Sequence, residues 1–432
     1  MHRCARVIGM VMALSASLLA GGCTGEGAPD SRPPAPSRSE SRSAPSQPAP
    51  QSVPSQPESP SSVPPLPRVP SAPELPGWTH SLGFAADGSG FALLAQCVED
   101  EVTPVNGFCR QHLAVLDRGA ARWVLRPSPL PEVHGTAGVS AVITVLGPGR
   151  ALIRESSERH PLRTWFTTDA GRSWRLGDLR AAGTADAIPE GAVLSTQCPG
   201  SAGPLVQECA RPRLVVISPE DGKVRFLARE PRLGAHPAPA GEAEPDGSWW
   251  VSGTDPRSGG TTLAVSRDAG RTWTVSRLPS PGADPAWGVA VSVGPDAVYA
   301  AERGEVPGVE PAKNPLRALH RSVDGGRTWT RVWVSGPQRE PRTLMGVPVA
   351  GPGGRLVVHG ERGTYAGTDG GRTFRDAGPG MYHVTRGRLG YLRSAAIGCA
   401  YGISPDGVRW VTFRLACQDG TDLHLTSREG PG

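Results

Sequence analysis

Short apolar runs alternate with turns through residues 77–432. Val, Ala and aromatic residues in runs of this kind, bounded by Gly and Pro, are typical of β-strands. One unit places its runs and turns in the order Trp287–Val293, Gly294–Asp296, Ala297–Ala301, Leu319–Ser322 and Thr328–Val334. Each such unit predicts four short antiparallel strands, and the same order begins again at Val139 and at Gly346.

One turn, which we call the cassette, is written almost identically four times, in Thr167–Trp174, Ser266–Trp273, Ser322–Trp329 and Gly367–Phe374. Its hydroxyl and carboxyl side chains can bond backbone N–H groups of the loop, its glycine allows a positive φ, and its aromatic residue begins the next strand. The defining positions are Thr167, Asp169, Gly171 and Trp174; Ser266, Asp268, Gly270 and Trp273; Ser322, Asp324, Gly326 and Trp329; and Asp369, Gly371 and Phe374. A turn of this kind builds a fold and performs no reaction.

Weaker copies of the cassette complete a repeat. They lie at Asp117–Trp123, Ser218–Gly222 and Ser404–Trp410, so that the aspartates recur every 37 to 56 residues. This spacing predicts an all-β propeller of seven four-stranded blades over residues 77–432. Six blades are the alternative, because the first and third cassettes are degenerate and the last interval is short.

The cassettes resemble the Asp-box of the BNR-repeat family, which occurs in sialidases, sortilin-type receptors and photosystem assembly factors. The resemblance implies a sialidase-like propeller in which the cassettes join the third and fourth strands of each blade. Their aromatic residues would then pack between neighbouring blades, and their aspartates would cap their own loops.

The N-terminal residues predict export. Arg3 and Arg6 precede an apolar run, Val7–Ala20, that is too short to span a membrane. Leu19–Cys23 is similar to the bacterial lipobox, although Ala20 stands where Leu is usual. We therefore expect a lipoprotein-type signal peptide at 1–22 and a lipid anchor on Cys23 at the outer face of the cytoplasmic membrane, with plain secretion as the alternative.

Residues 23–76 are dominated by Pro, Ser, Ala and Gln. Such a segment buries too little apolar surface to fold. It is predicted to be a disordered tether that holds the propeller away from the membrane.

The cysteines predict disulfide bonds. Once Cys4 is removed with the signal peptide and Cys23 is lipidated, six of the eight remain. Six cysteines allow 15 pairings, but an oxidising compartment and short loops favour local partners. The expected pairs are Cys97 with Cys109, Cys198 with Cys209, and Cys399 with Cys417. No histidine near them suggests zinc, and we predict no metal and no other cofactor.

Charge and motifs limit the function. Forty-five Lys and Arg against 40 Asp and Glu leave no strong basic excess, so no nucleic-acid partner is expected. No Gly-x-Ser-x-Gly, His-Glu-x-x-His or phosphate-binding glycine loop is present. Single histidines, His134, His160, His236, His320, His359 and His383, are more typical of surface or core positions than of metal sites.

A sialidase would need three arginines, a Tyr/Glu pair and an acidic residue around the channel. The first inner strand, expected within Gly77–Cys97, contains no arginine. Arg154, Arg303 and Arg393 lie in strand-like segments and could converge. The five tyrosines, Tyr299, Tyr365, Tyr382, Tyr391 and Tyr401, match no sialidase motif cleanly.

Three departures from the repeat are candidate binding features, because added loops on a rigid scaffold commonly carry function. Gly304–Pro315 lengthens the fifth blade between its second and third strands, and Val98–Phe108 is an acidic loop between two cysteines. Trp249 and Trp250 are consecutive in a strand and point to opposite faces, so one ring is expected in the core and the other exposed.

The sequence favours a monomeric, membrane-tethered, extracytoplasmic propeller with no catalytic residues. It would act as a binding or assembly module for a protein or a cell-envelope glycan, held on the face opposite the cassettes. The alternative is an exo-sialidase-like glycoside hydrolase.

Overall fold

The computed structural model describes residues 65–417 except 101, 136–137, 158–159, 201–208, 210, 235, 280–286, 307 and 309–311. The predicted signal peptide, Cys23 and most of the predicted tether lie outside the described residues. No helix in the described part is long and apolar enough to cross a membrane.

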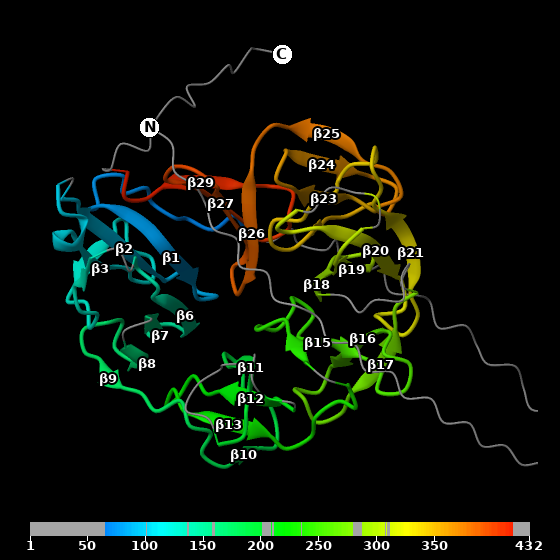
Figure 1. Ribbon diagram of the computed structural model, residues 1–432, viewed down its shortest axis with the longest axis horizontal. Coiled ribbons are helices and arrows are strands. Elements are labelled where there is room, and N and C mark those ends of the chain that lie inside the picture. Colours follow the sequence, from blue (N-terminus) through cyan, green and yellow to red (C-terminus); the bar gives the residue numbers. More distant parts are fainter. Residues whose placement is uncertain are drawn as a thin grey trace, which may run out of the picture. The chain divides into compact units, whose positions relative to one another are not determined.

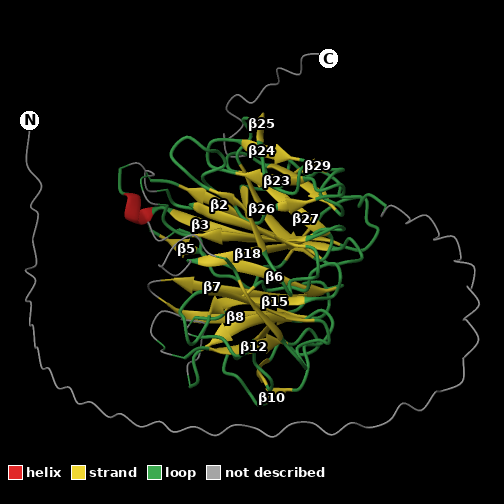
Figure 2. Cartoon of the chain, turned by 90° about the vertical axis from the view of Figure 1, so that its right-hand side faces the viewer, coloured by secondary structure: helices red, strands yellow, loops and turns green. Residues whose placement is uncertain are grey.

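Seven sheets, built mainly from antiparallel strands, follow one another round a ring (Figure 1). The fold is thus the expected seven-bladed β-propeller, and the six-bladed alternative is wrong. Figure 2 shows the strands from the side of the ring, with the short 3₁₀ helix η1 (Pro104–Asn106) at its edge.

The first four blades contain the strands of the N-terminal half. Blade 1 has β1 (Trp78–Phe84), β2 (Gly90–Val98), β3 (Phe108–Leu116), β4 (Val124–Arg126) and the short β5 (Val133–His134). Blade 2 has β6 (Val142–Gly147), β7 (Arg150–Ser157), β8 (His160–Thr167) and β9 (Arg175–Leu176). Blade 3 has β10 (Thr184–Ala185), β11 (Val193–Gln197), β12 (Arg213–Ile217) and β13 (Val224–Leu227). Blade 4 has β14 (Ala238–Pro239), β15 (Trp249–Thr254), β16 (Thr261–Ser266) and β17 (Thr274–Arg277).

The last three blades repeat the same order. Blade 5 has β18 (Gly288–Val293), β19 (Val298–Arg303), β20 (Leu316–Ser322) and β21 (Thr330–Val334). Blade 6 has β22 (Val349–Ala350), β23 (Leu356–His359), β24 (Thr364–Gly367) and β25 (Arg375–Gly378). Blade 7 has β26 (Tyr382–Gly387), β27 (Gly390–Ala395), β28 (Ala400–Ser404) and β29 (Val411–Arg414).

Blade 3 departs from the expected strand order. Its sheet runs β11, β12, β13 and β10 from the inside outwards, and β10 pairs with β13 in parallel. Its cassette therefore joins the second and third strands of the sheet, whereas the prediction placed every cassette between the third and fourth. The degenerate sequence Ser218–Gly222 gave no sign that the outer strand comes from earlier in the chain.

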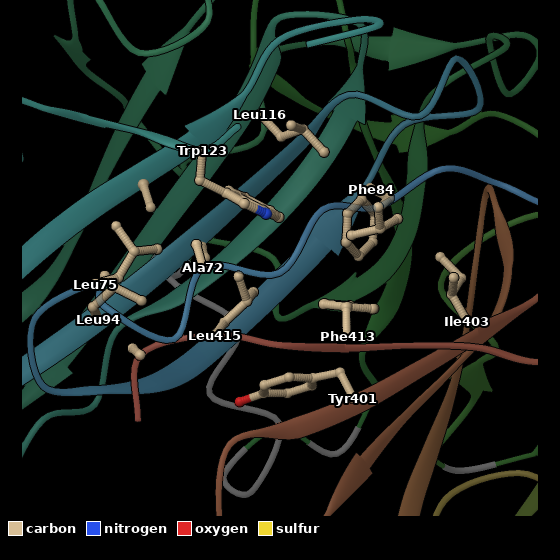
Figure 3. Close-up of a cluster of buried hydrophobic side chains, with 14 residues drawn as sticks. Ala72, Leu75, Phe84, Leu94, Leu116, Trp123, Tyr401, Ile403, Phe413 and Leu415 are labelled. Carbon is tan, nitrogen blue, oxygen red and sulfur yellow. The ribbon is translucent and has the colours of Figure 1, made fainter. Parts of the chain in front are cut away.

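The ring closes between blades 7 and 1 through a closure cluster of buried side chains (Figure 3). Phe413 of β29 packs edge-to-face on Phe84 of β1, with 5.9 Å between ring centroids, and Tyr401 stacks on Phe413 at 5.6 Å. Burial of large aromatic surface is the main favourable contribution here.

The folded unit also begins earlier than residue 77. Val69, Ala72 and Leu75 are buried in the closure cluster, and Ala72 exchanges backbone hydrogen bonds with Arg414 and Ala416 at 2.8 and 3.1 Å. The predicted tether is therefore too long at its C-terminal end. The boundary was predicted from the high Pro and Ser content of the segment, which gave little weight to three isolated apolar residues that pack in the closure cluster.

Three disulfides join the predicted pairs, Cys97–Cys109, Cys198–Cys209 and Cys399–Cys417. The last one fixes the end of β29, beside the segment that Ala72 pairs with. Disulfides of this kind indicate an oxidising, extracytoplasmic compartment.

Candidate functional site

The cassette aspartates are occupied by their own loops. Asp268 Oδ1 accepts from Ser266 Oγ at 2.8 Å and from the Thr272 backbone N–H at 2.8 Å, and its Oδ2 accepts from Thr272 Oγ1 at 2.6 Å. The Thr272 hydroxyl and N–H hold the pKa of Asp268 near 2. Asp169 and Asp324 make the matching bonds, and Asp369 makes those from Thr373. Both oxygens of each carboxylate accept hydrogen bonds within their own turn, as the loop-capping role predicts.

The cassette aromatic residues pack on the preceding blade. Trp329 lies edge-to-face against Trp250 at 6.1 Å, and Phe374 does so against Trp333 at 5.1 Å. The indole N–H of Trp273 donates to the Arg229 carbonyl at 2.9 Å. The adjoining glycine is required by the same packing: at Gly326, with φ +87°, a Cβ would lie 2.3 Å from the Trp250 ring.

Trp249 and Trp250 do not divide into a buried and an exposed ring. Both are buried, because neighbouring blades cover both faces of the blade 4 sheet. Trp249 packs in the core shared with blade 3 and Trp250 in the core shared with blade 5. The expectation of an exposed ring was wrong.

The channel is crossed by charged side chains at the cassette face. Arg388, in the turn between β26 and β27, donates to the carbonyls of Val145, Gly191 and Ala192 at 3.2, 2.7 and 3.1 Å. A blade 7 side chain thereby binds blade 2 and the segment that leads into β11. A hollow of about 150 Å³ remains beside Arg388, lined among others by Leu82, Val145 and Arg386.

Two glutamates, Glu242 and Glu244, lie near Arg386 and Arg388 of blade 7. Burial raises the pKa of Glu244 to about 7, although Arg386 lies 4.0 Å away and the Val293 N–H donates to Glu244 at 3.0 Å. Burial also raises the pKa of Glu242 against the charges of Arg388 and Arg386. Glu244 belongs to blade 4 and Val293 to blade 5, so this carboxyl ties two blades together.

The arginines considered for a sialidase site come from three different blades. Arg154, Arg303 and Arg393 lie on the second strands of blades 2, 5 and 7. Arg303 donates to the Gly346 carbonyl, and Arg393 lies over the rings of Tyr382 and Trp410 at 4.9 and 4.5 Å. β1, the first inner strand, has no arginine.

Four residues of the predicted insertion, Glu305, Val306, Ala312 and Pro315, line one side of a cavity of about 310 Å³, which we call the loop cavity. The connection between β21 and β22 provides Glu340, Arg342 and Thr343, and the β23–β24 turn provides Glu361 and Arg362. Successive antiparallel strands reverse direction, so these connections lie on the face opposite the cassettes. Trp287 stands at the cavity with 61 % of its surface exposed.

Two carboxylates of the loop cavity, Glu340 and Glu361, bind neighbouring residues of its walls. Glu340 accepts from Arg342 through both oxygens, at 2.7 Å from Nε and 2.8 Å from the backbone N–H. Arg362 lies 3.9 Å from Glu340, and Asn314 donates to Glu361 at 3.1 Å. Tyr365 lies behind Glu340, and burial together with that carboxylate raises the pKa of its hydroxyl.

Sequence reasoning found one wall of the loop cavity and missed the other two. Gly304–Pro315 broke the repeat and could be seen. Glu340 and Arg342 lie in the connection 335–348, and Glu361 and Arg362 lie in the short β23–β24 turn. No motif marks either segment, so only the fold brings these residues to the insertion. The second predicted loop, Val98–Phe108, is organised by Asp100, which accepts from the N–H groups of Val102 and Thr103 at 3.0 and 2.8 Å; it lines none of the cavities described here.

The histidines do not gather. His320 is fully buried and lies 3.0 Å from Glu302, whose other oxygen accepts from Thr261 at 3.0 Å. Within the described ranges, no three His, Cys, Asp or Glu side chains come together as a metal site. The side chain of His160 lies outside the described residues.

Comparisons with known proteins find only distant similarities. No protein-family model matches the sequence, and no curated protein matches it. Solved structures that are similar include a puromycin hydrolase (17% identity, TM-score 0.40, 83% of this chain and 58% of that one). Others are a GH74 xyloglucanase from Xanthomonas campestris (17%, 0.36, 79% and 60%) and YCF48 from Cyanidioschyzon merolae (15%, 0.32, 69% and 94%).

The chain spans less than two thirds of the length of the hydrolase and of the xyloglucanase. At these identities and scores the likeness says nothing about what this chain binds. The relation of the cassettes to the Asp-box family stays a prediction from the sequence, whereas the strand topology itself establishes the seven-bladed propeller.

Proposed function

We propose that this chain is an extracytoplasmic binding module, tethered to the membrane through Cys23, that holds a cell-envelope glycan in the loop cavity. The observation that carries the proposal is the exposed ring of Trp287 beside a cavity lined by carboxylates and guanidinium groups. An aromatic ring can cover the apolar face of a sugar, and charged acceptors and donors can bond its hydroxyl groups.

The position of the loop cavity supports this function. It opens on the face opposite the cassettes, where we expect the ligand. Its walls come from three separate connections of blades 5 and 6, fixed to each other by the ion pair of Arg362 with Glu340 and by the bond of Asn314 to Glu361. A cavity that is largely pre-formed loses little free energy to ordering when a ligand binds.

The same bonds favour binding over hydrolysis. Glycoside hydrolysis needs one carboxylic acid that donates a proton and one carboxylate that attacks or activates water. Glu340 accepts from Arg342 through both oxygens, so these bonds occupy lone pairs that such a role would use. A glycoside hydrolase is the second candidate, because Glu305, Glu340 and Glu361 do lie around one cavity.

The test is a glycan array with the full-length chain, run beside hydrolysis of fluorogenic glycosides that include sialosides. We expect binding without turnover. Trp287→Ala should weaken binding about 30-fold, which corresponds to about 2 kcal/mol for an aromatic anchor. Trp78→Ala is the matched control, because Trp78 is 39 % exposed and does not line the loop cavity; its effect should stay within about twofold.

The outcomes separate the candidates. Turnover that is lost in Glu340→Gln or Glu361→Gln would replace the binding module with a glycosidase. Equal losses in Trp287→Ala and Trp78→Ala would remove the loop cavity from the proposal. Silence in both assays would exclude a glycan and leave a protein partner as the ligand of this face.

A further inference from the structure

A second hollow runs along the outer edge of blade 4 and is independent of the loop cavity. It has a volume of about 510 Å³, and we call it the basic groove after its arginines, Arg229, Arg232, Arg257, Arg271 and Arg277. Two acidic residues, Glu230 and Asp255, also line it. A neighbouring hollow of about 430 Å³ shares Glu230 and Pro231 with it and extends it along blade 3.

The basic groove is elongated. It follows β17, with Arg271 in the cassette at one end and Arg257 in the β15–β16 turn at the other. β17 alone spans roughly 13 Å at the usual rise of a strand. Arg229 and Arg232 form the facing wall from the segment that follows β13, and Trp273 and Val275 supply its apolar floor.

Both carboxylates of the groove are neutralised within the protein. Asp255 accepts from Arg277 at 2.9 and 2.7 Å, and Glu230 accepts from Arg213 at 2.7 Å. In the described part of the chain, the guanidinium groups of Arg232 and Arg257 have no bonding partner, and both residues are exposed. Five guanidinium groups against two carboxylates give the lining a net charge of +3.

The unpaired arginines are not explained by protection of the sheet edge. Charged residues on an edge strand commonly prevent pairing with another chain, and Arg277 on β17 can serve that purpose. Arg232 and Arg257, however, lie outside β17, on the facing wall and in a turn. Unlike the exposed Arg118 and Arg122 of blade 1, these two line a hollow with three further arginines, and their donors are available to a ligand there.

We propose that the basic groove binds a linear polyanion, a polymer that carries phosphate or carboxylate groups. The planar guanidinium fork matches either anion with two parallel hydrogen bonds. A groove with cations at both ends accommodates an extended chain. The site lies on blades 3 and 4, so it does not depend on a ligand in the loop cavity.

The experiment measures binding of linear polyphosphate and of poly-L-glutamate to the full-length chain at low salt, by titration calorimetry. The groove variant is Arg232→Glu with Arg257→Glu. Its control is Arg118→Glu with Arg122→Glu, which makes the same change in net charge at exposed, unpaired arginines of blade 1 that line no cavity described here. Thermal unfolding of each variant checks that it is folded.

We expect the wild type and the blade 1 variant to bind with affinities within about twofold of each other. The groove variant should bind at least about tenfold more weakly. Binding of either polymer supports the proposal and identifies the preferred anion. Equal losses in the two variants, no binding by the wild type, or binding to phosphatidylglycerol vesicles in place of both polymers would overturn it.

Discussion

The loop cavity of blades 5 and 6 and the basic groove of blades 3 and 4 are built by opposite means. The cavity is made of connections, and an insertion outside the repeat forms one of its walls. The groove is made of the repeat itself, a cassette and the outer strand that follows it, with arginines added around them. The repeat therefore provides a rigid wall that carries charge, whereas a shaped cavity required residues beyond the repeat.

The two regions also differ in charge. Three glutamates and two arginines line the loop cavity, and two of the glutamates, Glu340 and Glu361, are bonded to Arg342 and Asn314. In the groove, arginines exceed carboxylates and two of them have no partner within the described ranges. Paired charges shape a site for a neutral, polar ligand, and unpaired charges of one sign attract an ion.

The largest test of this comparison concerns the ring that both regions share. Phe413→Ala should lower the free energy of unfolding by about 3 to 5 kcal/mol, because it opens a cavity in the closure cluster between blades 7 and 1. Denaturant unfolding measures the change, with Val323→Ala at an exposed position as a control expected to stay within about 0.5 kcal/mol.

Both binding activities of Phe413→Ala should disappear together as the temperature rises. If glycan binding and polyanion binding were lost in separate transitions, the two halves of the ring would fold independently. The loop cavity and the basic groove would then belong to two separately folding domains.

A second test uses the carboxyl that joins the blade of the groove to the blade of the cavity. The pKa of Glu244 is raised from 4.5 to about 7 by burial, so the folded protein keeps a proton that the unfolded chain releases. Folding stability should therefore fall as the pH rises from about 4.5 to about 7, by up to about 3 kcal/mol. The positive charge of Arg386 lowers the pKa of Glu244 and so opposes the effect of burial, whereas the negative charge of Asp246 raises it.

Glu244→Gln should remove this decline. His80 and His359, whose pKa values burial lowers to about 4, make stability rise with pH over part of the same range. The measured quantity is therefore the difference between wild type and variant, from unfolding at several pH values. A difference that does not change with pH would show that Glu244 is charged in the folded protein throughout.

The cassettes allowed the fold to be predicted because their bonds are local. Ser266, Asp268 and Thr272 satisfy one another within a single turn, so the sequence pattern and the structure carry the same information. The disulfides were predictable for the same reason. Blade 3 was not, since the pairing of β10 with β13 depends on a contact between distant segments.

The candidate sites divide in the same way. The insertion at Gly304–Pro315 was visible as an interruption of the repeat, but Glu340 and Glu361 reach it only through the ring. The basic groove could not be predicted, because arginines occur throughout the chain and nothing in the sequence marks Arg232 and Arg257 as unpaired. The burial of both Trp249 and Trp250 likewise depends on neighbours on the two faces of the sheet.

Salt concentration tests the difference between the two regions directly, with the smallest effect of the three. Binding to the basic groove should weaken about 25-fold, or about 2 kcal/mol, when the salt concentration rises about tenfold, if Arg232 and Arg257 each neutralise one anion. Binding of a neutral glycan in the loop cavity should change less than about twofold, because no counterions are released. Titrations of the same preparation with polyphosphate and with the best array glycan measure how each affinity depends on salt concentration.

A steep salt dependence for the glycan would mean that the loop cavity also recognises charge, and the contrast between paired and unpaired charges would then not separate the two sites. A shallow slope for polyphosphate would show that the groove arginines do not bind its anions.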